Sequence, residues 1–231
     1  MARRYNSADS KRRILSACVQ LFIKQGYHDT TVAEILKQAD VSSSTFQNIF
    51  HAKEGVLMDL LEFMYKNQFA SARTVSGEGA SPLKVYALET AIQLTITELN
   101  ENIRDIYVEI YSKPDTAESV YQHTADELYK IFGKYMPENT VSDFYELDIG
   151  SAGIMRAYMA RPCDKYFTLE KKLRRFITMS LNAYDVPDEE IAETISYIES
   201  LDIRAIATNV MKELFRSLAM KFDFTPETKT N

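Results

Sequence analysis

Four uncharged polar side chains between residues 43 and 48 have the chemistry needed to recognise the edges of DNA bases. They share the outward face of a short predicted helix, and they are Ser43, Ser44, Gln47 and Asn48. The amides of glutamine and asparagine can each bind adenine through two hydrogen bonds. A second set suits phosphate oxygens, because hydroxyls and helix starts bind them; its members are Thr31, Ser42, Thr45 and Lys53. For any one of these residues, the alternative is an ordinary solvated helix face.

Two short helices separated by a tight turn would position these side chains. The apolar residues of the first recur at helical spacing, and they are Val32, Ile35, Leu36 and Ala39. Thr31 and Glu34 fit a capping box at its start. Asp40 interrupts the pattern, and Ser42 is a suitable N-cap for the second helix, whose inward residues would be Thr45, Phe46, Ile49 and Phe50. This layout predicts a helix-turn-helix, in which the second helix enters the DNA major groove.

Residues 12–57 resemble the DNA-binding domain of the TetR family of transcriptional regulators. The matching residues are Arg12, Ile14, Leu15, Ala17, Leu21, Phe22, Gly26, Tyr27, Thr30, Thr31, Val32, Ile35, Ala39, Val41, Ser42, Thr45, Phe50, Lys53, Glu54 and Leu57. Two positions differ: Asp40 stands where the family usually has glycine, and Gln47 replaces an aromatic residue that in the family commonly contacts a phosphate. Gln47 would then contact either a phosphate or a base edge. The resemblance implies a homodimer that binds a near-palindromic operator, usually as a repressor released by a small-molecule effector.

The charge distribution favours a nucleic-acid-binding head on an acidic body. The whole chain carries a net charge of −6, but residues 1–54 carry +3 and the remainder −9. A basic head of this kind would bind phosphate while the body repels DNA. Arg3 and Arg4 would either reach into a minor groove, as basic arms do, or form a solvated tail.

The remaining sequence predicts an all-α protein with two domains and a short tail. The 231 residues include few glycines and prolines, and apolar residues recur at helical spacing over most of the chain. We expect a helix-turn-helix domain over residues 1–54, an effector-binding and dimerisation domain over 55–224, and a disordered tail over 225–231. A connecting helix would begin near Lys53 and end before the glycines of residues 75–81. Body helices are predicted over residues 82–100, 102–112, 115–132, 142–160, 167–184 and 187–222, with a kink or break near Asp202 in the last.

Aromatic and methionine residues concentrate between residues 83 and 160, and this composition suits a cavity for a mostly apolar small molecule with a polar group. The predicted effector-binding residues are Tyr107, Tyr111, Tyr129, Met155 and Tyr158; the alternative for each is an ordinary core position. Residues 167–222 would pair with a second copy as a four-helix bundle, because a long amphipathic helix pair needs a partner for its apolar face.

Several function classes lack their characteristic residues. The sequence has no GxSxG, P-loop, GxGxxG or HExxH motif, so we expect no enzyme and no cofactor. Cys18 and Cys163 are isolated, as in a reducing cytoplasm, and they suggest no metal site. No run of 18 apolar residues predicts a membrane span. The remaining alternative is an all-α protein-interaction adaptor without specific DNA binding, and the basic head argues against it.

Overall fold

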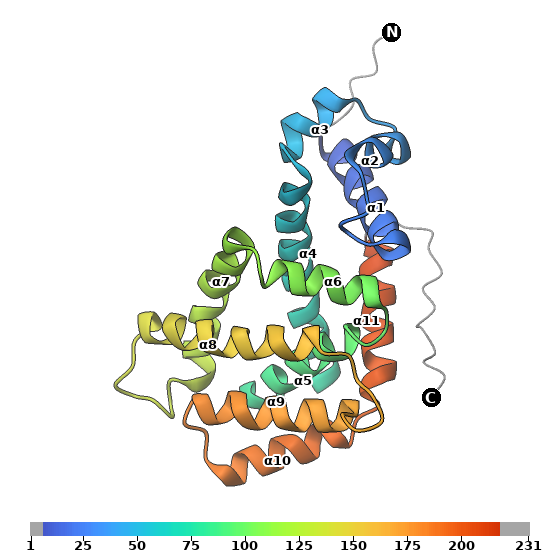
Figure 1. The fold of residues 1–231 in the computed structure, drawn as a ribbon. Coiled ribbons are helices and arrows are strands. Elements are labelled where there is room, and N and C mark those ends of the chain that lie inside the picture. Colours follow the sequence, from blue (N-terminus) through green and yellow to red (C-terminus); the bar gives the residue numbers. More distant parts are fainter. Residues whose placement is uncertain (1–6, 218–231) are drawn as a thin grey trace.

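The computed structural model describes residues 7–217, apart from the side chains of residues 63, 65–69 and 217, and this part of the chain is all-α, as predicted. Three helices form a head, a fourth runs from it, and seven form a body below (Figure 1). The head helices are α1 (Ser7–Gln25), α2 (Val32–Ala39) and α3 (Ser43–Phe50), and the connector is α4 (Lys53–Ser76). The body helices are α5 (Pro82–Ile96), α6 (Glu101–Ile110), α7 (Pro114–Phe132), α8 (Val141–Ala160), α9 (Leu169–Ala183), α10 (Asp188–Glu199) and α11 (Ile203–Ser217).

Local capping signals place the head helices where the sequence predicts them. The Thr31 backbone N–H donates to Glu34 Oε2 at 2.8 Å, and the Glu34 N–H donates to Thr31 Oγ1 at 3.3 Å, which completes the capping box of α2. Asp40 ends α2 in the left-handed region, with φ at 51°. Ser42 Oγ then accepts the Thr45 N–H at 3.1 Å and caps α3. The predicted domain boundary at residue 54 falls at the start of α4.

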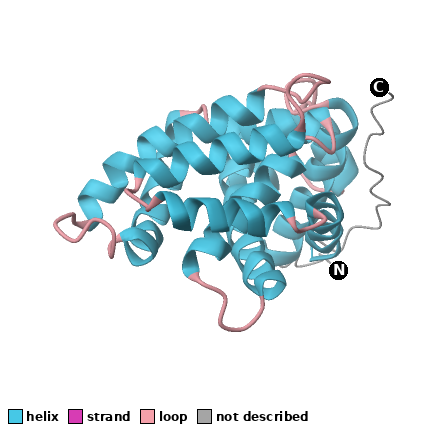
Figure 2. Ribbon diagram, turned by 90° about the horizontal axis from the view of Figure 1, so that it is seen from below, coloured by secondary structure: helices cyan, strands magenta, loops and turns pink. Residues whose placement is uncertain are grey.

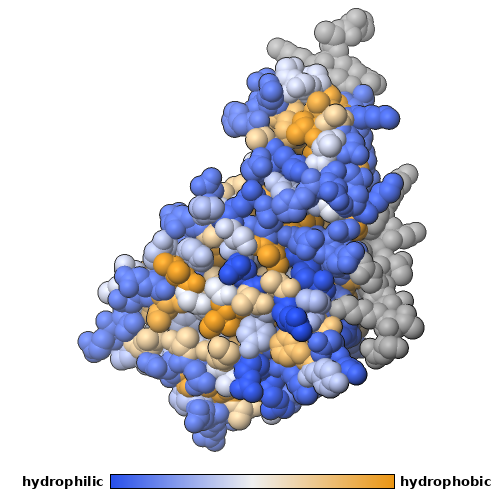
Figure 3. Space-filling view, viewed as in Figure 1, coloured by the Kyte–Doolittle hydropathy of each residue, from blue (hydrophilic) through white to orange (hydrophobic). Residues whose placement is uncertain are grey.

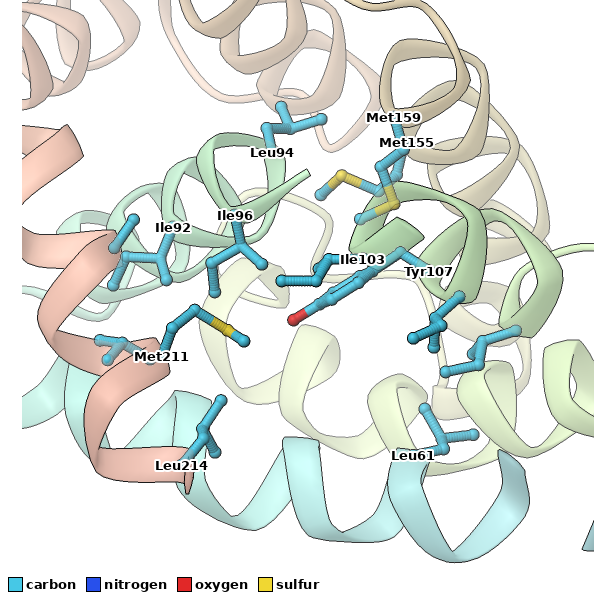
Figure 4. Packing of buried hydrophobic residues seen from close by; sticks show 14 of the residues in the cluster. Leu61, Ile92, Leu94, Ile96, Ile103, Tyr107, Met155, Met159, Met211 and Leu214 are labelled. Atoms are coloured by element: carbon cyan, nitrogen blue, oxygen red, sulfur yellow. The ribbon is translucent and has the colours of Figure 1, made fainter. Parts of the chain in front are cut away.

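Helix α5 is the centre of the body. Nearly all of its side chains are buried, and it packs against α4, α7, α8, α9, α10 and α11. Figure 4 shows Ile92, Leu94 and Ile96 of α5 within the apolar core shared with α6, α8 and α11. Seen from below, the body helices lie alongside one another and the connecting loops lie mainly at the edges (Figure 2). Among residues 7–217, no helix is long and apolar enough to cross a membrane.

The break predicted near Asp202 is confirmed. The stretch that begins at residue 187 forms two helices, α10 and α11, so the described part of the body has seven helices rather than the six predicted ranges. The break follows from capping, because Asp202 Oδ1 accepts the Ala205 N–H at 3.1 Å and starts a new helix. Residues 218–222, the predicted tail over 225–231, and the basic pair Arg3 and Arg4 lie outside the described residues.

Other predicted boundaries need smaller corrections. The helix predicted over residues 82–100 ends at Ile96, and tight turns follow it. Helix α7 starts at Pro114, one residue earlier than predicted, and its start has no side-chain cap. Proline suits the first helical turn because its missing N–H would have no partner there. Helix α8 has a capping box that the sequence analysis missed, since the Thr140 N–H donates to Asp143 Oδ2 at 2.6 Å.

A buried ion pair joins the end of α5 to α9. Lys172 Nζ lies 2.7 Å from Glu98 Oε1, and both side chains are at most 2% exposed. The other carboxylate oxygen, Oε2, accepts the backbone N–H of Cys163 at 3.0 Å, and Arg104 lies 3.8 Å away. Burial opposes ionisation, yet the hydrogen bonds from Lys172 and Cys163 hold the pKa of Glu98 below its ordinary value. The body thus supplies a buried carboxylate with cations of its own.

Candidate nucleic-acid interface and effector cavity

The outward face of α3 presents all four predicted base-reading side chains to solvent. Ser43, Ser44, Gln47 and Asn48 are exposed, as the predicted helix phase requires. Phe46 and Phe50 anchor the opposite face in the core of the head, with their ring centroids 5.7 Å apart. These two buried rings fix α3 on the head while its polar face stays exposed to solvent. This arrangement suits insertion into a major groove.

The turn before α3 is fixed by contacts from α1. Arg13 Nη1 donates to the carbonyls of Ala39 at 2.9 Å and Asp40 at 3.0 Å, and these two residues end α2. The left-handed backbone at Asp40 tolerates aspartate better than most residues. Because Arg13 of α1 holds this turn, contacts within the head fix the angle between α2 and α3.

Three of the four predicted phosphate-binding residues cluster at helix starts. Thr31 and Ser42 are exposed N-caps, and Thr45 is half-buried in the first turn of α3. Their hydroxyls are already engaged locally, since Ser42 Oγ lies 2.8 Å from Thr45 Oγ1 and Thr31 Oγ1 donates to Glu34 at 2.8 Å. Thr45 is thus less completely inward than predicted. Both caps stand at helix N-termini, which are favourable places for a phosphate.

Lys53 has a structural role that the sequence analysis did not foresee. Its ammonium donates to the carbonyls of Tyr27 at 2.7 Å and Thr30 at 2.9 Å, and it lies 4.3 Å from the centroid of the Tyr27 ring. It therefore fastens the loop between α1 and α2 to the start of α4. At most one of its three N–H groups is left for a phosphate.

The five predicted effector-binding residues do not share one cavity. Tyr111 and Met155 line a cavity of about 50 Å³ between α5, α7, α8 and α9, here called the inner cavity. Tyr107 lines a separate apolar cavity of about 60 Å³ between α1, α4, α6 and α11, and Figure 4 shows its ring pointing from α6 toward Met211. Tyr129 is 43% exposed, and Tyr158 donates to Met179 Sδ at 3.5 Å outside both cavities. Helical phase alone does not distinguish these locations.

The inner cavity contains polar residues that the sequence analysis missed. Its polar lining comes from four elements and includes Glu89, Thr90, Gln93, Tyr111, Thr124, Asp148 and Ser151; its apolar lining includes Val120, Leu128, Ile131, Met155 and Phe176. No lysine, arginine or histidine lines it. One signal was available, because Glu89 and Gln93 stand one helical turn apart within an otherwise apolar stretch.

Two buried carboxyl groups, Glu89 and Asp148, line this cavity. Glu89 Oε1 accepts from Gln93 Nε2, and Gln93 Oε1 accepts the Tyr111 hydroxyl at 3.1 Å. Asp148 accepts from Thr124 and, at 2.7 Å, from Ser151. Burial raises the pKa of Glu89 to about 7, against the opposing hydrogen bond from Gln93, and it also raises the pKa of Asp148.

An outer cleft of about 320 Å³ adjoins the inner cavity. It is lined by α4, α5, α7 and the turn at residues 77–80, and it shares Tyr86, Glu127 and Ile131 with the inner cavity. Arg73 of α4 lies 3.5 Å from Glu127 of α7 across this cleft. A molecule in the outer cleft would therefore contact the connector. In the described part of the chain, no group of three or more His, Cys, Asp or Glu side chains is placed to hold a metal ion.

The family model for bacterial regulatory proteins of the tetR family matches residues 14–60. This segment of the chain is similar to the tetR family of bacterial regulatory proteins. The match covers α1 to α3 and the first third of α4, so the TetR-family segment includes both the turn and the recognition helix. The predicted family resemblance is confirmed.

Two curated relatives agree with this assignment. The chain is 30% identical over 95 residues to the uncharacterised HTH-type transcriptional regulator YuxN of Bacillus subtilis, covering 41% of this chain and 31% of that protein. It is 28% identical over 117 residues to YvkB of the same organism, also an uncharacterised HTH-type transcriptional regulator, covering 51% and 59% of the two chains. The chain thus matches less than two thirds of the length of either relative.

A solved structure extends the likeness in fold to the body. The regulator TylP of Streptomyces fradiae, described as a TetR regulator, aligns with a TM-score of 0.55 at 19% identity, over 97% of this chain and 96% of that one. The body is therefore similar in fold to the corresponding part of TylP.

Proposed function

We propose that the protein is a sequence-specific DNA-binding transcriptional regulator, and that it represses its target until a small-molecule effector releases it. The observation that carries the proposal is the exposed face of α3, with Gln47 and Asn48 directed outward from a TetR-family helix-turn-helix. Amide side chains on such a face can discriminate adenine from the other bases. None of the matched proteins supports the adaptor alternative.

The proposal includes a homodimer, because one recognition helix reads too short a DNA segment for high specificity. A two-fold pair would place two α3 helices about 34 Å apart, over successive major grooves of a near-palindromic operator. The predicted dimer surface over residues 167–222 needs revision, because α11 buries Val210, Leu214 and Phe215 within its own chain.

The outer faces of α8 and α9 are better candidates for the dimer contact. Ile149 on α8 is 45% exposed and Met179 on α9 is 42% exposed. Gly150 and Gly153 leave open space above α8, which would allow another helix to approach closely. Figure 3 shows apolar side chains among polar ones over the region where α8 and α9 lie.

The deciding experiment is selection of bound sequences from a random DNA pool, with the mass of the protein measured in solution alongside. Enrichment of a palindromic sequence by a dimer supports the proposal. A folded protein that enriches nothing, even after unfolding, dialysis and refolding to remove any co-purified ligand, would contradict it and favour the adaptor.

Release by an effector requires coupling between the body and the head. Helix α4 runs from the head into the body, where it packs against α5, α6, α7 and α11. A ligand shifts this equilibrium only through a difference in its affinity for the two states. Gel-shift titrations that do not change with a ligand bound in the body would refute this part of the proposal.

A further inference from the structure

The inner cavity holds two buried carboxyl groups for which its lining provides no cationic partner. Glu89 and Asp148 are 3% and 6% exposed, and no cationic side chain lines the cavity, although Glu127 at its edge pairs with Arg73 and Lys130. The contrast lies nine residues further along the same segment, where buried Glu98 receives both Lys172 and Arg104. Leaving a buried charge unpaired is costly. The body therefore provides cations for one buried carboxylate and none for the other two.

One oxygen of the pair is also left without a hydrogen bond. Both oxygens of Asp148 accept hydroxyl groups, from Thr124 and Ser151. Glu89 Oε1 accepts from Gln93, but Glu89 Oε2 has no hydrogen-bond partner in the part of the chain that the structure describes. Since Glu89 lines the cavity, this oxygen is a free acceptor at its wall. A ligand that carries positive charge and donates a hydrogen bond would supply both the missing cationic partner and the missing donor to Glu89 Oε2.

We infer that the inner cavity binds a small organic cation, with a protonated amine between Glu89 and Asp148 and a hydrocarbon part that extends past Ile131 into the outer cleft. The dimensions agree with this division. The inner cavity of about 50 Å³ accommodates an ammonium group and a short stem, and the outer cleft of about 320 Å³ accommodates a larger apolar part. The inference rests on the proposed function only in treating this cation as the effector.

The site also predicts how binding depends on pH. The ionisable groups that face Glu89 are Asp148 on α8, Glu127 on α7, and the phenols of Tyr86 and Tyr111. None of them supplies positive charge, so the ammonium group binds the ionised form of Glu89. Because the pKa of Glu89 is raised to about 7, affinity should increase as the pH rises from 6 to 8, while an alkylamine stays protonated.

The test uses the full-length protein and matched probes that differ only in the head group. Alkylammonium chlorides from ethyl to hexyl are titrated calorimetrically at pH 8, together with the alcohols of the same chain lengths. We expect the ammonium ions to bind and the alcohols to bind at least tenfold more weakly, because hydrogen bonds to charged groups are worth roughly one to two orders of magnitude in affinity. Equal binding of the two series would overturn the inference.

Two substitutions and one control locate the site. Glu89→Gln and Asp148→Asn keep the shape of the side chains and should each weaken alkylammonium binding about tenfold or more. Glu118→Gln is the matched control, because this carboxylate of α7 accepts the Tyr145 hydroxyl at 2.8 Å outside the cavity. Unchanged binding in both cavity variants would refute the site. Should a variant not fold, the comparison of ammonium ions with alcohols on the unaltered protein still decides.

DNA selection separates this inference from the proposed function. A palindromic sequence enriched by a protein that binds no alkylammonium ion would overturn the cation assignment and leave the regulator intact. Alkylammonium binding that requires Glu89, in a protein that enriches no DNA, would support the cation site and contradict the regulator.

Discussion

Replacing Glu89 with glutamine should stabilise the unliganded protein at neutral pH. The substitution keeps the side-chain volume and a carbonyl oxygen that accepts from Gln93, but it removes a carboxyl group that is 3% exposed and has no cationic partner. Burial raises the pKa of Glu89 from its ordinary value of 4.5 to about 7. A difference of that size corresponds to about 3 kcal/mol, taken at about 1.4 kcal/mol per pKa unit.

The sign of the effect follows from proton linkage. Because the pKa of Glu89 is higher in the folded protein than in the unfolded chain, folding takes up a proton between pH 4.5 and 7. Its contribution to stability is therefore fully present below pH 4.5 and is lost as the pH rises through 7. The Glu89→Gln variant has no such loss. The two proteins should have similar free energies of unfolding near pH 4.5, and the variant should be more stable by about 3 kcal/mol at pH 8.

Urea unfolding followed by circular dichroism at several pH values from 4.5 to 8 measures this difference. Shifts from other groups, including the raised pKa of Asp148 and the lowered pKa of Glu98, occur in both proteins and largely cancel in the comparison. Two parallel stability curves would show that Glu89 is not an uncompensated buried acid, and they would refute the reasoning. Glu118→Gln serves again as the control, for which we expect no comparable pH-dependent gain.

Four further predictions test other parts of the structure. Lys172→Met should lower the free energy of unfolding by about 3–5 kcal/mol by leaving Glu98 buried and unpaired, and adding Glu98→Gln should restore much of the loss in urea titrations. At Asp40, whose φ is 51°, glycine should be nearly neutral and valine should cost about 1–2 kcal/mol, measured by thermal unfolding. Lys53→Ala should cost about 1–3 kcal/mol through its two carbonyl contacts, and a phosphate contact would also lower the salt slope of DNA binding by about 1. Gln47→Ala should relax base preference at one position of each half-site by about 1–3 kcal/mol, read from selected sequences.

Features decided by neighbouring residues could be predicted from the sequence. The capping box at Thr31, the interruption at Asp40 and the N-cap at Ser42 each depend on residues within three or four positions, and the structure contains all three. The family resemblance added the spacing that joins them into a helix-turn-helix. The outward face of α3 followed from helical phase, because two phenylalanines fix the inward face.

Features decided by packing between distant elements could not be predicted. Helical spacing marks Tyr107, Tyr111 and Tyr129 as similar, yet one lies in each of two cavities and the third is exposed, because different helices cover them. The structural role of Lys53 depends on carbonyls 23 and 26 residues away. The elements that surround Glu89 are likewise distant in sequence. The raised pKa of Glu89 therefore could not be predicted from the spacing of apolar residues.

Two helices connect the inner cavity to the head. At the end of α6, the hydroxyl of Tyr111 reaches Gln93 in the cavity wall; at the start of α6, Asn102 Nδ2 donates to the Ile23 carbonyl of α1 at 2.9 Å. The second connection is α4, which meets the outer cleft through Arg73 and Glu127. The apolar cavity of about 60 Å³ lies where α1, α4, α6 and α11 meet, so the junction is not fully packed. If a ligand displaces α4 or α6, the direct contacts of these helices would therefore move the head. The cavity at the junction leaves room for this movement.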